Sequence, residues 1–169
     1  MTLIKSISGI RGTIGGKPGD GLTPLDIVKF TAAYGSWIKN NSSVEKVKIV
    51  VGRDARISGE MVSNVCIGTL QGLGIDVVNL DLSTTPTVEI AVPLENAQGG
   101  IILTASHNPG GPDEDFGIKY NCENGGPAPE TLTNSIYEIT KTISTIKICE
   151  TFPNINVDNI GSNIISATD

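Results

Sequence analysis

Residues 47–80, VKIVVGRDARISGEMVSNVCIGTLQGLGIDVVNL, contain two short β-branched runs on either side of a helical pattern. The runs at 47–52 and 75–80 have the composition of buried strands. Between them, apolar residues recur on one helical face: Val62, Cys66, Leu70 and Leu73. Gly74 is a suitable residue to end that helix. The strand, helix and strand therefore predict a βαβ unit with parallel strands.

The same alternation continues on both sides of this unit. LTPLDIVKFTAAYGSWIKN, at 22–40, predicts a helix because Thr23 can cap it and Pro24 suits its first position. A further helix is expected to start at Pro86, and GGIILTA at 99–105 predicts a third strand. We therefore expect an α/β fold, a three-layer α/β/α sandwich with a mostly parallel mixed sheet.

The remaining sequence is less regular. Residues 109–129 are rich in turn residues around one predicted short strand near 117–120. Residues 129–143, PETLTNSIYEITKTI, predict another helix. We expect one domain over residues 1–150, and we expect 151–169 to be a linker or the start of the next segment.

The composition limits the functions that this chain can have. Of its 169 residues, 38% are apolar and 18% are charged, which is typical of a globular protein. A net charge of −6 argues against a nucleic-acid partner, which requires a basic face. No apolar run approaches the roughly 20 residues of a membrane helix, and the first residues do not resemble a signal peptide. We expect a cytoplasmic protein with reduced cysteines and without a membrane partner.

Two of the predicted strands end in polar loops, GRDARISG at 52–59 and TASHNP at 104–109. In sheets of this kind, ligands bind at the carboxyl ends of the strands. The second loop holds Ser106 beside His107, which is the single histidine of the chain. Ser106 is therefore a candidate for an ordinary turn residue, for an acyl-transfer nucleophile, or for a phosphate carrier.

The acyl-transfer interpretation is the weakest of the three. Adjacent residues in a loop rarely face each other, as a Ser-His pair must, and there is no G-x-S-x-G motif. A phosphate on Ser106 would gain from loop N–H groups, from Asn108 and from nearby cations, and it could bind Mg²⁺. A plain nucleotide-binding domain is disfavoured because G-x-G-x-x-G and Walker A motifs are missing.

TASHNP resembles the active-site loop of the phosphohexomutases, the phosphoglucomutase and phosphomannomutase superfamily. Three further blocks resemble family segments in the same order. They are SGIRGT at 8–13, similar to an N-terminal Gly-Ile-Arg-Gly loop, VGRDARISG at 51–59, and GIKYN at 117–121 with the active-site lysine. The resemblance covers about residues 1–145 and is to the first of the four domains of these enzymes.

The resemblance implies a phosphorylated Ser106 that exchanges its phosphoryl group with a hexose 1-phosphate or 6-phosphate, with glucose 1,6-bisphosphate as intermediate and activator. It assigns catalytic roles to Ser106, His107, Lys119 and Arg11. Arg11, Asn108 and Lys119 would bind phosphate, and the phosphate of Ser106 would be a ligand of Mg²⁺. The expected partners are the hexose phosphate and the remaining mutase domains, and the isolated chain is expected not to be a competent mutase.

Three further expectations follow from the resemblance. Residues 1–109 resemble the bacterial branch and 110–145 the eukaryotic, parafusin-like branch, which indicates either a lineage of mixed features or a composite sequence. Arg53, Asp54 and Arg56 are candidates for catalytic residues, but we favour a structural role in which Asp54 and Arg53 hold the neighbouring loop by charged hydrogen bonds. The alternative function is a non-catalytic, parafusin-like phosphoprotein or interaction module.

Overall fold

The computed structural model describes residues 3–6, 8–111, 113–147 and 164–166. Its centre is a seven-stranded sheet in the order β1-β2-β6-β5-β3-β4-β7. The strands are β1 (Ile4–Ser6), β2 (Gly9–Thr13), β3 (Lys48–Arg53), β4 (Asp76–Leu82), β5 (Gly99–Leu103), β6 (Asp115–Asn121) and β7 (Ile164–Ser166). The helices are α1 (Pro24–Asn41), α2 (Gly59–Gly72), α3 (Thr85–Leu94) and α4 (Glu130–Thr142).

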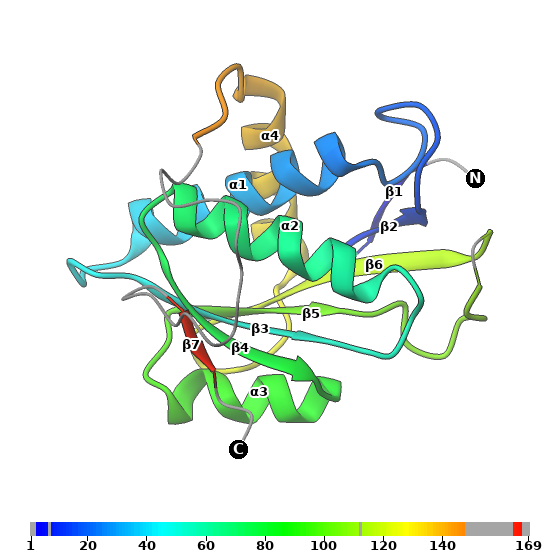
Figure 1. Ribbon diagram of the computed structural model, residues 1–169. Helices are drawn as coiled ribbons and strands as arrows, with labels where there is room; N and C mark the ends of the chain where they lie inside the picture. The colour runs from blue at the N-terminus through cyan, green and yellow to red at the C-terminus, as the bar shows by residue number, and fades with distance from the viewer. Residues whose placement is uncertain (1–2, 7, 112, 148–163, 167–169) are drawn as a thin grey trace.

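The helices cover the two faces of the sheet unequally. Figure 1 shows α1, α2 and α4 on one side of the sheet and α3 on the other, which confirms the three-layer sandwich. The larger apolar core lies under α1, α2 and α4, and a smaller one lies between α3 and the strands β3, β4 and β5. None of the described helices is both long and apolar enough to cross a membrane.

The sheet is mixed, and its two kinds of pairing occupy different parts of it. β3 pairs in parallel with β4 and β5, and β4 pairs in parallel with β7. β6 is antiparallel to β5 and to β2, and β2 is antiparallel to β1. Because β6 runs back from the carboxyl end of β5, the start of β6 lies at the edge where β3 and β5 end. Residues 151–163 and 167–169 of the expected linker lie outside the described residues.

The start of α1 follows directly from the sequence. The Thr23 hydroxyl accepts a hydrogen bond from the amide of Asp26, and the Asp26 carboxylate accepts one from the amide of Thr23 at 3.1 Å. This reciprocal pair satisfies two amides that a helix start leaves without partners. The same carboxylate accepts a bond from the amide of Gly19, which ties the preceding loop to the helix.

Two adjacent glycines let both helical layers approach β5, all of whose residues are buried. A Cβ at Gly99 would collide with the hydroxyl of Tyr34, which donates a 2.7 Å hydrogen bond to the carbonyl of Asn121. A Cβ at Gly100, on the opposite face, would lie 2.7 Å from a methyl group of Val92 in α3. The pair at 99–100 therefore allows close packing on both sides of the central strand.

Two strands lie where no strand was predicted. The segment 8–13, which resembles a loop of the family, forms β2, and β2 makes a hairpin with β1. β6 is also longer than the predicted 117–120 strand. β1 and β2 are short and β2 contains two glycines, so their β-propensity is low, and the pairing of β2 with β6 on one side and with β1 on the other decides their conformation.

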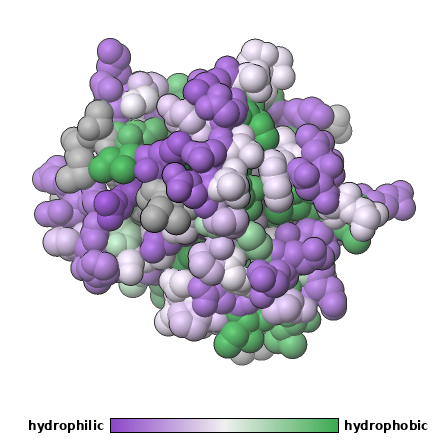
Figure 2. Space-filling model, turned by 180° about the vertical axis from the view of Figure 1, so that it is seen from behind, coloured by the Kyte–Doolittle hydropathy of each residue, from purple (hydrophilic) through white to green (hydrophobic). Residues whose placement is uncertain are grey.

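An apolar area is exposed on the outer side of α3. Figure 2 shows hydrophobic side chains at the lower edge of the molecule, where α3 lies. Ile90 and Leu94 of α3 are 66% and 74% exposed, and Leu82 at the end of β4 is 59% exposed. Packing among the described residues leaves these side chains uncovered.

Replacing Gly99 by Ala should lower the free energy of unfolding by about 2 kcal/mol, because the added methyl group must displace the buried hydroxyl of Tyr34. Gly111→Ala is the control, since its Cβ would meet only the side chain of Glu114, at 3.3 Å. Urea unfolding of both variants measures the difference. Equal stability of the two variants would contradict the tight packing at β5.

Cys66 should resist alkylation in the folded protein. Burial raises the pKa of its thiol to about 12, and the thiol lies 3.3 Å from the hydroxyl of Thr31. At pH 8 the reactive thiolate is therefore scarce as well as inaccessible. Cys122 is only partly buried, and burial raises its thiol pKa too. Iodoacetamide at pH 8, followed by peptide mass spectrometry, should label Cys122 well before Cys66, and equal rates would contradict this.

Candidate active site

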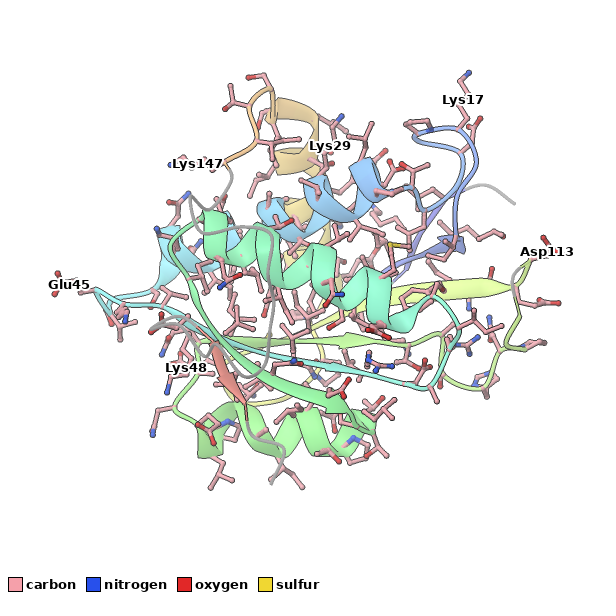
Figure 3. The ribbon with its side chains drawn as sticks, viewed as in Figure 1. Lys17, Lys29, Glu45, Lys48, Asp113 and Lys147 are labelled. Carbon is pink, nitrogen blue, oxygen red and sulfur yellow. The ribbon has the colours of Figure 1, made fainter. Side chains whose placement is uncertain are left out.

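The candidate site is built on residues 104–111, called the serine loop, which leave the carboxyl end of β5. Figure 3 shows Asp113, just beyond this loop, at the opposite end of the molecule from Glu45. The serine loop begins beside β3, because the amide of Asp54 donates a 3.0 Å hydrogen bond to the carbonyl of Leu103. The two polar loops of the sequence are thus neighbours, as the parallel pairing of β3 and β5 requires.

A chain of hydrogen bonds joins the two loops. The Thr104 hydroxyl, which is almost fully buried, donates to Asp54 Oδ2 at 2.6 Å. The same hydroxyl accepts from the amide of Ser106 at 2.9 Å. The oxygen of this hydroxyl thus binds the backbone of Ser106, and its proton binds Asp54 in the loop that follows β3.

Ser106 has a backbone conformation that is unusual for a residue with a side chain. Its φ of +60° lies in the left-handed region, which costs a non-glycine residue on the order of 1 kcal/mol or more. Its side chain is exposed, and so is that of His107. The surrounding hydrogen bonds offset the strain and present the hydroxyl to solvent.

Arg56 lies inside the bend of the serine loop, with only 11% of its side chain exposed. Its Nη1 donates to the carbonyls of Pro109 at 2.7 Å and Asp115 at 3.1 Å. Its Nη2 donates to the carbonyls of Asn108 at 2.7 Å and Ser106 at 3.3 Å. Its Nε donates to Asp54 Oδ2 at 3.0 Å. The Arg56 guanidinium therefore joins Asp54 in the loop after β3, the serine loop and the start of β6.

Arg53 does not join this network, although it was expected to hold the loop together with Asp54. Its Nε instead donates to Asp81 Oδ1 at 2.7 Å, at the end of β4. Arg53 is the last residue of β3 and Asp54 follows the strand, and their side chains contact different neighbours. Asp54 does hold the serine loop as expected, and Arg56 takes the role given to Arg53.

Asp115, which the sequence did not single out, connects Arg11 to the serine loop. Its Oδ2 accepts from the amide group of Asn108 at 2.9 Å and lies 3.3 Å from Arg11 Nε. Its side chain is 10% exposed, whereas that of Arg11 is 38% exposed. Asn108 therefore holds the loop through Asp115, and the same carboxylate orients a partly exposed cation.

Arg11 and Lys119 occupy one face of the sheet. Arg11 pairs with Gly117 across the β2–β6 ladder, so Asp115 and Lys119 are its two diagonal neighbours on the same face. Ile10 and Ile118, which alternate with them, lie in the large core on the other face. On the face that holds Arg11 and Lys119, α3 packs against β3 and β5. We call the part of this face formed by β2 and β6 the open sheet face. Its two cations are partly exposed.

The glycine opposite Arg11 keeps the open sheet face close to the serine loop. A Cβ at Gly117 would collide with the carbonyl of Thr104, and the amide of Thr104 donates to the carbonyl of Gly117 at 2.9 Å. Hydrogen bonds to Arg56 thus connect Ser106 and Asn108, and the ion pair with Asp115 adds Arg11 to this group. Lys119 shares the face, but among the described residues it has no ion-pair partner.

The arrangement offers cations and an exposed hydroxyl, but few metal ligands. Asp54 and Asp115 both contact residues of the serine loop, and both already accept hydrogen bonds. Within the described ranges, no group of three or more His, Cys, Asp and Glu side chains could hold a metal ion. A metal at Ser106 would therefore need ligands beyond these side chains.

The fold and the serine loop define an α/β/α domain whose candidate site lies at the carboxyl ends of its central strands. The chain belongs to the phosphoglucomutase/phosphomannomutase family, whose α/β/α domain I matches residues 3–147. The resemblance inferred from the four sequence blocks is thereby confirmed.

Two curated relatives are eukaryotic phosphoglucomutases. Phosphoglucomutase 1 of Saccharomyces cerevisiae is 43% identical over 140 residues, which are 79% of this chain and 24% of that protein. Phosphoglucomutase-1 of Dictyostelium discoideum is 49% identical over 116 residues, which are 67% of this chain and 20% of that protein. The chain thus spans about a fifth to a quarter of their length. Both alignments are much longer than 110–145, so the likeness to eukaryotic enzymes extends into the residues before Gly110.

Solved structures agree with this assignment. A putative phosphomannomutase from Thermus thermophilus superposes with a TM-score of 0.71 and 29% identity, over 83% of this chain and 30% of that one. The open form of the exocytosis-sensitive phosphoprotein pp63/parafusin, a phosphoglucomutase from Paramecium, gives a TM-score of 0.69 and 30% identity. That match covers 85% of this chain and 25% of the parafusin chain.

Replacing Thr104 by Val should lower the free energy of unfolding by about 2 kcal/mol, since it leaves the amide of Ser106 without its acceptor and Asp54 without one donor. Thr69→Val is the matched control, because the Thr69 hydroxyl donates only to the carbonyl of Val65 within α2. Denaturant unfolding gives the stabilities, and hydrogen exchange should show faster exchange at Ser106 only in Thr104→Val. Unchanged exchange there would disprove the role of this hydroxyl.

Proposed function

We propose that this chain is the phosphoserine-bearing first domain of a phosphohexomutase, which interconverts hexose 1-phosphate and hexose 6-phosphate through a 1,6-bisphosphate. The observation that carries the proposal is the exposed Ser106, held in a left-handed conformation in a loop that Asn108 and Asp115 connect to Arg11. Strain at a serine that points to solvent favours a functional role over that of an ordinary turn residue. The phosphoglucomutase relatives support the same activity.

In the proposed reaction, the bond between phosphorus and Ser106 Oγ breaks as a bond from phosphorus to a sugar hydroxyl oxygen forms. The sugar hydroxyl loses its proton, and the serine oxygen gains one. Lys119 and His107 are the candidate proton carriers in this domain. Arg11 and Lys119, both on the open sheet face, would neutralise charge on the transferring group.

The implied Mg²⁺ fits this domain only in part. The nearby carboxylates of Asp54 and Asp115 are already bound to Thr104, Arg56, Asn108 and Arg11, so the phosphate of Ser106 is the ligand that this domain would supply. When bound there, Mg²⁺ would neutralise part of the phosphate's negative charge. Its other ligands and the recognition of the sugar would come from the remaining mutase domains, in keeping with the share of the relatives that this chain spans. We propose that the protein acts in the cytoplasm, because some of its plant relatives are cytoplasmic phosphoglucomutases by name.

The first test is phosphorylation of Ser106. Incubation with Mg²⁺ and glucose 1,6-bisphosphate should add one phosphate to the chain, mapped to Ser106 by peptide mass spectrometry and missing in Ser106→Ala. Arg11→Lys should load more slowly, because Lys keeps the charge but cannot keep the fork geometry beside Asp115. No phosphate on Ser106 under these conditions, with the fold intact, would count against the proposal.

The 169-residue chain by itself should not isomerise glucose 1-phosphate to glucose 6-phosphate. Phosphoryl transfer depends on positioning and on charge neutralisation, and this domain supplies only part of both. A coupled assay for glucose 6-phosphate checks this, and measurable turnover would contradict it. A Ser106 that loads but never passes its phosphate on, even when the other mutase domains are supplied, would favour the non-catalytic phosphoprotein.

A further inference from the structure

Arg56 is the most heavily hydrogen-bonded side chain at the site, and the proposed reaction gives it no part. A guanidinium has five N–H bonds, one on Nε and two on each Nη. Arg56 directs them to five acceptors, which are the Asp54 carboxylate and the backbone carbonyls of Ser106, Asn108, Pro109 and Asp115. It therefore has no donor left for a ligand, unlike the partly exposed Arg11.

The direction of these carbonyls determines the direction of the amides that share their peptide planes. In a trans peptide the N–H points opposite to the C=O, and the described residues contain no cis peptide. Because the Ser106 carbonyl points toward Arg56, the N–H of His107 points away from it. Because the Pro109 carbonyl points toward Arg56, the N–H of Gly110 points away as well.

The peptide bond between Asn108 and Pro109 has a carbonyl but no N–H. The Asn108 carbonyl also accepts from Arg56, and the next residue is Pro109, which has no N–H. His107 and Gly110 are exposed, and within the described part of the chain neither amide donates to a protein acceptor. Two free N–H groups are thus left on the solvent side of the loop that carries the Ser106 hydroxyl.

We propose that Arg56 is a positioning residue that turns the carbonyls of the serine loop inward, so that the amides of His107 and Gly110 form a seat for a phosphate oxygen at Ser106. This rests on the proposed role of Ser106 as phosphate carrier. Backbone amides oriented in this way bind anions, and they keep their direction when the phosphoryl group leaves and returns. Arg11 and Lys119 supply positive charge near the phosphate, and Arg56 sets the direction of the two amides.

The first experiment titrates inorganic phosphate into the ¹⁵N-labelled 169-residue chain and follows its amides by NMR. The amide protons of His107 and Gly110 should move downfield and saturate together. The amide of Asn108, which donates to the carbonyl of Ala105, should move much less. If phosphate shifts other amides and leaves those of His107 and Gly110 in place, the proposed seat does not exist. This experiment uses the unsubstituted chain, so its result does not depend on whether a variant folds.

Arg56→Lys and Arg53→Lys form a matched pair for the second experiment. Lys keeps the charge, but it cannot donate in a planar fork to several carbonyls at once. Arg56→Lys should weaken phosphate binding at the two amides by about tenfold, the effect of losing one charge-assisted hydrogen bond. Arg53→Lys should bind as the parent chain does, because among the described residues the Arg53 side chain bonds Asp81 and not the serine loop. Parental affinity in a folded Arg56→Lys overturns the proposal.

Chemical rescue separates geometry from stability. Arg56→Ala with added guanidinium, at concentrations well below those that denature, should regain the phosphate response of His107 and Gly110, whereas added ammonium should not. Equal rescue by the two cations would show that charge alone suffices and would overturn the proposal. Loading of Ser106 from glucose 1,6-bisphosphate is read separately. A chain that never loads but shows the two amide shifts contradicts the proposed function while leaving the seat intact.

Discussion

The hydrogen bonds that the Asp54 carboxylate accepts from Thr104 and Arg56 make two strand-end loops into one unit, and the rest of the site depends on this unit. The Thr104 hydroxyl also accepts a hydrogen bond from the amide of Ser106. Arg56 also donates to the carbonyls of Ser106 and Asn108. The side chains of Thr104 and Arg56 at the centre of this network are largely covered, so their hydrogen bonds are worth more than they would be in water. The result is a serine whose strained backbone is already in place before any ligand arrives.

The order of the strands explains why the cations are where they are. An all-parallel sheet would have helices over both faces of every strand. Here β6 turns back antiparallel to β5, and the β1–β2 hairpin extends the sheet beyond the reach of α3. The open sheet face that results holds Arg11 and Lys119 next to the serine loop. A single carboxylate, Asp115, sits where the face and the loop meet.

Sequence reasoning succeeded where short-range signals were strong. The βαβ unit, the capped start of α1 and the neighbourhood of the two polar loops could all be predicted, because apolar spacing and caps act over a few residues. It missed β2, because a five-residue strand with two glycines has no local signal and forms only against β6. It also assigned the wrong arginine to the loop. The acceptors that separate the two arginines, Asp81 for Arg53 and the serine-loop carbonyls for Arg56, lie 28 or more positions away along the chain.

By itself, the sequence determined the α/β/α fold, the family and the serine with its expected cations. These follow from periodicity and from motifs in which neighbouring residues act together. Only the tertiary structure decided that Arg56 binds the carbonyls of Ser106, Asn108 and Pro109, and that Asp115 links Asn108 to Arg11. These contacts join residues up to about a hundred positions apart, and they exist because β3, β5, β6 and β2 pair side by side. Such pairing comes from burial of the whole sheet, which no single segment of the sequence encodes.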